Sequence, residues 1–264
     1  MENTASCFLE LASNQRLGLL FSLSREKSTI SKLTKELNAT APEIHRNLQR
    51  LHKSSLITKG VDGFFHLTPF GNMVLSQIPS FDFMSKNEKY FKTHNFGQVP
   101  LKFIQRVGDL QGAQHVKGFV KVQEQWLSIY KNAKKYIFNI LYEVPYTIEI
   151  VKTLSEKLNE GVKLKSIFLE SAIISKEREK LINQSNLKKI FQKDLVERKM
   201  RKDVSAIVFL NETEACLAFS TSDGEIDVGE AFYSNNQRFH DWCLDFFTHS
   251  WDSSNSFIES KLNL

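Results

Sequence analysis

The segment Thr40–Leu51 constrains the fold more than any other stretch, because it carries a complete set of helix signals. Thr40 suits the N-cap, Pro42 suits the first turn, and the Glu43 carboxylate can accept a hydrogen bond from a free backbone N–H. Apolar residues at helical spacing share one face (Ile44, Leu48 and Leu51). The opposite face holds cations and long hydrogen-bonding side chains (Pro42, His45, Arg46, Gln49, Arg50 and Lys53). Such a face suits a DNA major groove, although this pattern alone also fits an ordinary solvated helix.

The residues before this helix supply the partners that a DNA-binding unit needs. Cys7–Leu23 has apolar residues at helical spacing and predicts a first helix with a buried face. Thr29–Leu37 predicts a short second helix, and Asn38-Ala39 then forms a tight turn. Short helices joined by such a turn, the last with a polar outer face, describe a helix-turn-helix.

The residues after this helix predict a β-hairpin. Leu56–Lys59 and Phe64–Leu67 are short extended runs on either side of Asp62-Gly63, whose residues tolerate positive φ. Thr68-Pro69 then starts another helix, which we expect to run to Ile78. A hairpin directly after the recognition helix is the wing of a winged helix, so the whole order of elements is more specific than any one of them.

Residues 7–78 resemble the winged-helix domain of archaeal regulators in the arsenic-repressor-like superfamily. The resemblance is carried by four motifs (Ala12-Ser-Asn-Gln-Arg16, Ile30-x-x-Leu33-x-x-x-Leu37, Arg46-x-Leu48-x-x-Leu51 and Leu67-Thr-Pro-Phe-Gly71). It implies that the helix 40–54 enters the major groove, where Pro42, His45, Arg46 and Gln49 face base edges. Thr40 starts that helix, and Arg50 and Lys53 meet phosphates, while Lys59 and Gly63 of the wing lie along the neighbouring backbone or minor groove. It also implies a homodimer on two half-sites.

The second half of the chain alternates strand and helix patterns. Tyr136–Tyr142 and Val162–Leu169 predict strands around a helix from Thr147 to Asn159, which makes a βαβ unit. Residues 173–191 have a helical and charged pattern. Val204–Leu210 and Ala215–Ser220 predict a hairpin, and Arg238–His249 predicts a final amphipathic helix.

The run Phe219–Trp251 resembles the C-terminal part of the methanogenesis-regulator-type transcription factors of archaea. Its motifs are Asp223-Gly-Glu-Ile-Asp227, Phe232-Tyr-Ser234, Phe239-His-Asp-Trp-Cys243 and Phe246-Phe247, and His94 with Val99-Pro100 fits the start of the same domain. The resemblance implies an α/β effector domain, similar in outline to phospholipase-D-like domains, that senses a small molecule or mediates dimerisation.

Charge and cysteine content exclude several classes. The net charge is +5; residues 1–80 contain nine Lys/Arg against six Asp/Glu, so the positive excess is densest there and is compatible with DNA binding. The cysteines are Cys7, Cys216 and Cys243, none in a C-x-x-C pair, which argues against a disulfide framework or thiolate zinc site. Neither a secretory signal nor an apolar run of membrane-spanning length occurs, so we expect a cytoplasmic protein with no membrane partner.

Two alternatives from other classes remain open. A phospholipase-D-like phosphodiesterase needs His-x-Lys-x-x-x-x-Asp; His115-Val-Lys117 is the one His-x-Lys, the Asp position holds Val122, and the segment has a helical pattern. The chain is therefore expected not to be an enzyme. The second alternative is an interaction scaffold whose winged helix binds protein, and it would show no salt-dependent DNA affinity.

Candidate metal and carboxylate sites are better explained by packing. His240 and Cys243 share a helix face with Phe247, which favours a packed core over a metal site. Asp223 and Asp227 fit a turn and a strand end, with no base or nucleophile beside them. His45, His52 and His66 form no cluster of the metal-sensor kind. We therefore expect neither metal nor cofactor.

The sequence thus predicts an α+β or α/β chain in three parts. Residues 1–79 form a winged helix-turn-helix, residues 80–135 a helical linker or dimerisation segment, and residues 136–264 a non-catalytic, phospholipase-D-like α/β effector domain. Its expected partners are double-stranded DNA, a second copy of itself and a small-molecule effector of unknown identity.

Overall fold

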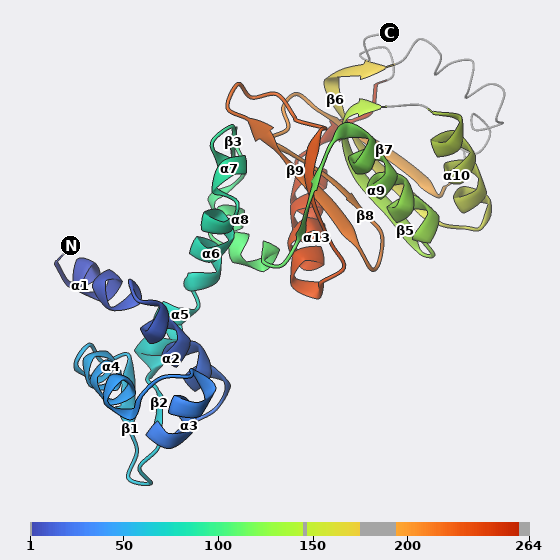
Figure 1. The fold of residues 1–264 in the computed structure, drawn as a ribbon. Coiled ribbons are helices and arrows are strands. Elements are labelled where there is room, and N and C mark those ends of the chain that lie inside the picture. The colour runs from blue at the N-terminus through green and yellow to red at the C-terminus, as the bar shows by residue number, and fades with distance from the viewer. Residues whose placement is uncertain (1, 145–146, 175–193, 259–264) are drawn as a thin grey trace. The chain divides into compact units, whose positions relative to one another are not determined.

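A computed structural model describes residues 2–144, 147–174 and 194–258 (Figure 1). The chain divides into two compact units, Met1–Phe81 and Asp82–Leu264, which are called unit 1 and unit 2 below. This division differs from the expected three parts, because residues 82–135 belong to unit 2 and do not form a separate linker.

Unit 1 consists of helices and a two-stranded hairpin. In chain order its elements are α1 (Glu2–Leu11), α2 (Asn14–Arg25), α3 (Ile30–Glu36), α4 (Ala41–Lys53), β1 (Ile57–Lys59), β2 (Phe65–Leu67), α5 (Pro69–Leu75) and the first residues of α6 (Ile78–Lys86). The order of short helix, helix with polar face and hairpin follows the sequence prediction.

The predicted first helix, Cys7–Leu23, is in fact two helices. Ser13 interrupts it with extended backbone, and its side chain accepts a hydrogen bond from the Arg16 N–H, so Ser13 is the N-cap of α2. Arg16 is buried and donates from its guanidinium to the Leu9 and Glu10 carbonyl oxygens, 2.9 and 2.7 Å away. Those bonds satisfy carbonyl groups at the end of α1, which would otherwise lack hydrogen-bond partners where the helix stops.

The core of unit 1 is built from the apolar faces that the sequence predicted. Ile44, Leu48 and Leu51 of α4 are at most 1% exposed and pack with leucines of α2 and α3. Each such side chain contributes about 1.5–3 kcal/mol when fully buried. Gly71 is required at the start of α5, because a Cβ there would lie 1.9 Å from the Leu56 carbonyl oxygen.

The hairpin of unit 1 is tied to the residues before α3. Strands β1 and β2 pair antiparallel, with Ile57 opposite Leu67 and Lys59 opposite Phe65. Ser28 adds a bridge to the other edge of β2, since its N–H donates to Phe65 O (3.0 Å) and its carbonyl accepts from Phe65 N–H (2.9 Å). The hairpin therefore has backbone pairing on both sides of β2.

Unit 2 is a mixed sheet with helices packed against it. Its elements after α6 are α7 (Glu88–Phe91), β3 (His94–Asn95), α8 (Leu101–Ile104), a 3-10 helix (Val107–Leu110), β4 (Gln114–Lys117), α9 (Phe119–Asn132), β5 (Tyr136–Val144), α10 (Ile148–Asn159), β6 (Lys163–Ile174), β7 (Val196–Arg201), β8 (Ala206–Leu210), β9 (Ala215–Thr221), β10 (Glu230–Ser234), α13 (Gln237–Asp252) and β11 (Asn255–Ser256).

The strands follow the order β11-β7-β6-β5-β8-β9-β10-β4, and β3 pairs with β9 (Figure 1). The pairs β5–β6 and β6–β7 are parallel, and the pairs from β5–β8 outwards to β4 are antiparallel. The predicted βαβ unit and the hairpin of β8 and β9 are thus present in the sheet.

Helices pack on both faces of this sheet. Successive side chains of a strand point to opposite faces, so neighbouring residues of β5 contact different helices. Phe138 of β5 stacks on Phe247 of α13 with ring centroids 4.9 Å apart. On the other face, the next residue, Asn139, donates to the Tyr130 hydroxyl of α9 (2.7 Å). The sheet therefore has α13 on one side and α9 on the other.

Two predictions in unit 2 need correction or lie outside the structure. The segment around His115 was expected to be helical, but Gln114–Lys117 is strand β4, and the helix begins only at Phe119. Gly118, at φ +100°, separates the two. The helix expected over residues 173–191 falls almost entirely outside the described residues.

Candidate nucleic-acid interface

The outer face of α4 is exposed as its sequence predicts. All six of its polar-face residues are exposed (Pro42, His45, Arg46, Gln49, Arg50 and Lys53), and the apolar face is buried. Within the described part of the chain, Arg46 and Lys53 form no salt bridge. Their charges are therefore available to an external anion.

The start of α4 is fixed by an exchange between its cap and its third residue. The Glu43 carboxylate accepts from the Thr40 N–H (3.0 Å) and from the Thr40 hydroxyl (2.9 Å). These hydrogen bonds from Thr40 lower the pKa of Glu43. Thr40 is exposed, but its hydroxyl is engaged in holding the helix start.

Unlike Arg46 and Lys53 on the same helix, Arg50 is already paired with a carboxylate. Its guanidinium binds the Glu10 carboxylate of α1 through two hydrogen bonds, Nη2 to Oε1 at 2.7 Å and Nε to Oε2 at 3.0 Å. The hydrogen bond from Arg50 is the main reason that the pKa of Glu10 is lowered. Arg16 Nε lies 3.2 Å from the same carboxylate, so Glu10 joins two cations from α2 and α4.

The tip of the hairpin is ordered by Lys27, which lies outside the hairpin. Lys27 Nζ is 2.6 Å from the Asp62 carboxylate and 5.0 Å from the centre of the Phe64 ring. The hydrogen bond from Lys27 lowers the pKa of Asp62. Gly63 adopts φ +81°, which suits a glycine, and Val61 at the tip is fully exposed. Lys59 is exposed on β1, with its ammonium 5.5 Å from the Phe65 ring centre.

The structure places the predicted residues on α4, at its start and on the hairpin, and one of them, Arg50, is already bound to a carboxylate. Thr40, Gly63 and Lys59 occupy the helix start and hairpin as expected, and Arg50 is committed to Glu10. Sequence reasoning missed Glu10 and Lys27. The signal for Lys27 was only its proximity to a helix start, and Glu10 lies 40 residues before its partner.

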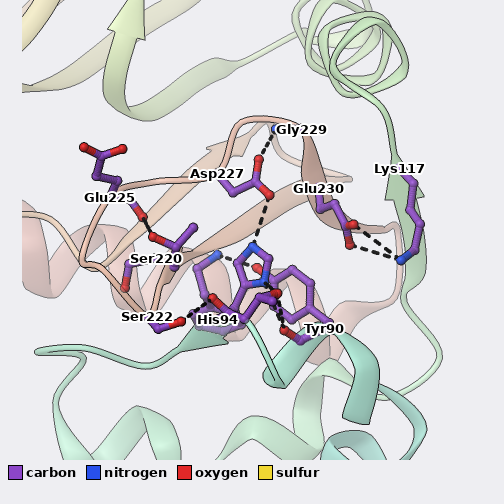
Figure 2. Close-up of polar contacts among 12 residues, drawn as sticks. Tyr90, His94, Lys117, Ser220, Ser222, Glu225, Asp227, Gly229 and Glu230 are labelled. Atoms are coloured by element: carbon purple, nitrogen blue, oxygen red, sulfur yellow. Dashed lines mark hydrogen bonds and ion pairs between the residues drawn. The ribbon is translucent and has the colours of Figure 1, made fainter.

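Unit 2 contains a polar cluster that links strand β3 to the loop before β10 (Figure 2). The His94 ring stacks on Tyr90 at 3.7 Å, and its Nε2 lies 3.2 Å from the Asp227 carboxylate. Asp227 also accepts from the Gly229 N–H (2.6 Å), and the Tyr90 hydroxyl accepts from the Phe219 N–H (3.0 Å). Burial raises the pKa of Tyr90. These contacts fasten α7 and β3 to the sheet.

The one His-x-Lys pattern lies beside this cluster, and both its polar side chains face the same carboxylate. His115 Nε2 is 2.8 Å and Lys117 Nζ 3.2 Å from Glu230 of the paired strand β10. Burial is the main cause that lowers the pKa of His115. Val122, at the position where a phospholipase-D pattern needs Asp, is buried in α9.

The candidate metal ligands of α13 lie in the core. His240 Nε2 is 2.7 Å from the Asn211 carbonyl oxygen, so its N–H donates there, and Cys243 is fully buried. Asp223 lies in the turn before Gly224, and Asp227 is bonded as described above. Among the described residues, no group of three His, Cys, Asp or Glu is arranged to hold a metal ion.

Residues 7–89 match the family model described as the HVO_A0261 N-terminal domain. The match covers less than half of the chain and concerns unit 1 with the first residues that follow it. A search of curated proteins finds no match. No helix in the described ranges is both long and apolar enough to cross a bilayer.

Among solved structures, the chain is similar to TrmBL2, an archaeal chromatin protein with a novel mode of DNA binding. The identity is 12% over 92% of this chain and 93% of TrmBL2, with a TM-score of 0.43. Nuc of Salmonella typhimurium, a phospholipase D family member, is 14% identical over 55% of this chain and 97% of its own (TM-score 0.38). NucT of Helicobacter pylori is 11% identical over 55% and 98% (TM-score 0.41). All three TM-scores are too low for the likeness to assign a fold family or an activity.

Proposed function

We propose that the chain is a sequence-specific regulator of transcription that binds double-stranded DNA through a winged helix in unit 1. One observation carries the proposal: α4 exposes a row of polar side chains beside a hairpin, and two cations of that row, Arg46 and Lys53, have no ion-pair partner among the described residues. Arg46 and Lys53 lie on that row and Lys59 on the hairpin. A major groove admits an α-helix, and a hairpin that follows such a helix can contact the adjacent backbone.

The individual residues have separate tasks in this proposal. Arg46 and Gln49, with Pro42 and His45, face base edges, because guanidinium and amide groups read guanine and adenine by paired hydrogen bonds. Lys53 and Lys59 meet phosphates, which contribute affinity without sequence information. Thr40 and Gly63 shape the helix start and the wing.

A homodimer fits the proposal because winged-helix regulators read two half-sites. Unit 1 exposes an apolar patch on α1 and α6, where Phe8 and Phe81 are 50% and 48% exposed and their rings are 5.9 Å apart. Adjacent Leu9 is 61% exposed. Such a patch is available for association with a second copy. Unit 2 then serves as the sensor or dimerisation part, and its ligand would bias the arrangement of the two copies.

The test is selection of bound fragments from a random duplex pool, followed by titration of the selected duplex. The wild type is compared with Arg46→Ala/Gln49→Ala and with Gln237→Ala/Arg238→Ala, which removes the same residue types from the exposed start of α13. We expect a palindrome that the wild type and the control bind, and at least tenfold weaker binding by the α4 variant.

Enrichment that the α4 variant retains would refute the assignment of α4 as recognition helix. Absence of any enrichment, together with affinity that does not change with salt, would favour a protein-binding scaffold. We further propose that the chain is not a phosphodiesterase, since His115 and Lys117 lack the acidic partner at Val122. Hydrolysis of bis(p-nitrophenyl) phosphate that a His115→Ala variant loses would refute this.

A further inference from the structure

A cavity of about 60 Å³ lies between α13 and the sheet of unit 2. Its lining includes both apolar and polar side chains (Val99, Ile140, Val204 and Phe246; Arg201, Asp203 and His249). The volume is about twice the roughly 30 Å³ that a water molecule occupies in the liquid, and well below the roughly 150 Å³ of a cavity that holds benzene. The cavity therefore has room for a molecule of a few non-hydrogen atoms and not for a ring.

This cavity lies at the edge of the sheet where the parallel strands end. Strands β5, β6 and β7 run parallel, so their carboxyl ends lie at one edge. Arg201 is the last residue of β7, and Ile140 of β5 is two residues after Phe138, so both side chains of β5 point to the face that α13 covers. Ligands of open α/β sheets bind at the carboxyl ends of the strands.

The guanidinium of Arg201 is held in place and keeps one end unbonded. Its Nη1 donates to the Ser253 hydroxyl (2.9 Å) and the Ser250 carbonyl oxygen (3.4 Å), and its Nε donates to the Asp203 carbonyl oxygen (3.2 Å). Nη2 forms no hydrogen bond among the described residues, because the Asp203 carboxylate oxygen is 3.8 Å away. The Arg201 side chain is 26% exposed, so two fixed N–H donors are open to an external acceptor.

A second cation lies close to the cavity beside His249. Lys102 Nζ is 3.3 Å from His249 Nδ1; an ammonium group can only donate, so Nδ1 accepts and the imidazole proton is on Nε2. Burial lowers the pKa of His249 most, and the charges of Lys102 and Arg201 lower it further, while Asp252 acts in the opposite direction. Two positive charges therefore lie near one imidazole that lines the cavity, and the lining itself contains one carboxylate, Asp203.

We propose that this cavity binds a small aliphatic carboxylate, or the carboxylate end of a larger ligand. A carboxylate oxygen accepts from Arg201 Nη2, and the alkyl group lies against Ile140 and Phe246. Phosphate is disfavoured, because its further oxygen atoms would lie against apolar side chains that offer no donor.

The test uses acetate as probe and acetamide as its matched control. The two have nearly the same shape, but acetamide carries no charge. Sodium acetate replaces sodium chloride at constant ionic strength in a solution of the full ¹⁵N-labelled protein, and the Nε–H signal of Arg201 is followed by NMR. That signal is identified by its loss in Arg201→Gln.

We expect saturable binding of acetate with a dissociation constant of about 1 mM, as for a ligand of this size. Acetamide should bind about tenfold more weakly, because hydrogen bonds to a charged group are stronger than neutral ones. Inorganic phosphate, titrated in the same way, should also bind more weakly than acetate.

Two variants should change the affinity in opposite directions. Arg201→Gln should abolish binding, which is read from the backbone amide signals that acetate moves in the wild type. Asp203→Asn removes the competing carboxylate from a side chain that is 57% exposed, and should strengthen binding about threefold. The control Lys121→Gln removes an exposed cation from α9, on the other face of the sheet, and should leave binding unchanged.

The proposal would be overturned by the absence of a saturable shift with acetate, by equal binding of acetate and acetamide, or by phosphate that binds as tightly as acetate. Binding that persists in a folded Arg201→Gln variant would also overturn it. Where Arg201→Gln does not fold, Asp203→Asn decides, because its exposed carboxylate forms no hydrogen bond among the described residues. Affinity that does not rise in Asp203→Asn would then count against the site.

The regulatory role of such a ligand rests on the proposed function, but the site does not. Replacing chloride by acetate in a titration with the selected duplex, at constant ionic strength, tests the role. Binding at Arg201 without any effect on DNA affinity would leave the site intact and remove its role as an effector site.

Discussion

Because Arg50 is paired with Glu10, we predict that removing Arg50 and removing Lys53, two cations on the same exposed face of α4, have different effects on DNA binding. Lys53 forms no salt bridge in the described structure, whereas the Arg50 guanidinium already binds a carboxylate at 2.7 and 3.0 Å. Lys53→Gln and Arg50→Gln each remove one positive charge from α4. Only the first should remove a phosphate contact.

The magnitude follows from counterion release. Each phosphate that a protein neutralises contributes about 0.9 to the slope of log K against log salt concentration. We therefore expect Lys53→Gln to reduce that slope by about 0.9, with about the same proportional loss on selected and random duplexes. Arg50→Gln should leave the slope unchanged, since Arg50 would first have to leave Glu10. Its measurable effect should be a lower melting temperature of unit 1.

The assay is fluorescence anisotropy of a labelled duplex between about 50 and 200 mM salt, the range over which such slopes are well determined. Glu10→Gln provides the complementary measurement, because it releases Arg50 and should raise the slope by up to about 0.9. A slope that falls equally in Arg50→Gln and Lys53→Gln would show that Arg50 exchanges Glu10 for phosphate. The pairing of Arg50 with Glu10 would then not describe the DNA-bound state.

Three further predictions concern the fold. The pKa of Glu10 in the folded protein lies below its ordinary value of 4.5. The stability that ionised Glu10 contributes is therefore present above pH 4.5 and is lost as the pH falls through the lowered pKa. Urea unfolding should show a smaller loss of stability at acid pH in Glu10→Gln than in the wild type. Trp242→Phe removes the N–H bonded to the Phe103 carbonyl oxygen (3.1 Å) and should lower the free energy of unfolding by about 2–3 kcal/mol, whereas a change below about 0.5 kcal/mol would mean that solvent replaces the bond. Burial raises the pKa of Cys216 to about 12 and raises that of Cys243, so both thiols should react with Ellman's reagent only after unfolding, and reaction in the native protein would contradict their burial.

Local signals account for the parts of unit 1 that the sequence predicted well. Helix α4 carries its cap, first-turn proline and apolar face within its own residues, and the hairpin has its turn at Asp62-Gly63. The exposure of Arg46, Gln49 and Lys53 on one face of α4 followed from the same helical spacing. By contrast, the removal of Arg50 depends on Glu10, a residue that no periodicity of α4 could indicate.

The errors in unit 2 have the same physical origin. Residues 114–117 form a strand only because they pair with β10, which lies more than 100 residues later. Their own pattern continues into the helix that starts at Phe119, so a single helix was the natural interpretation. The limits of a strand at a sheet edge depend on a partner, whereas caps mark the limits of a helix.

The bridge between Ser28 and Phe65 has a consequence for how unit 1 would meet a duplex. Because Lys27 holds Asp62 and Ser28 holds β2, the hairpin is preformed, and association would require little loss of backbone entropy there. The Phe65 N–H, which donates to Ser28 O, should exchange slowly with deuterium in the free protein and change little when DNA is added. Recognition by this hairpin would then proceed by docking of a rigid surface, and duplexes of other sequences would be rejected by their shape as well as by their bases.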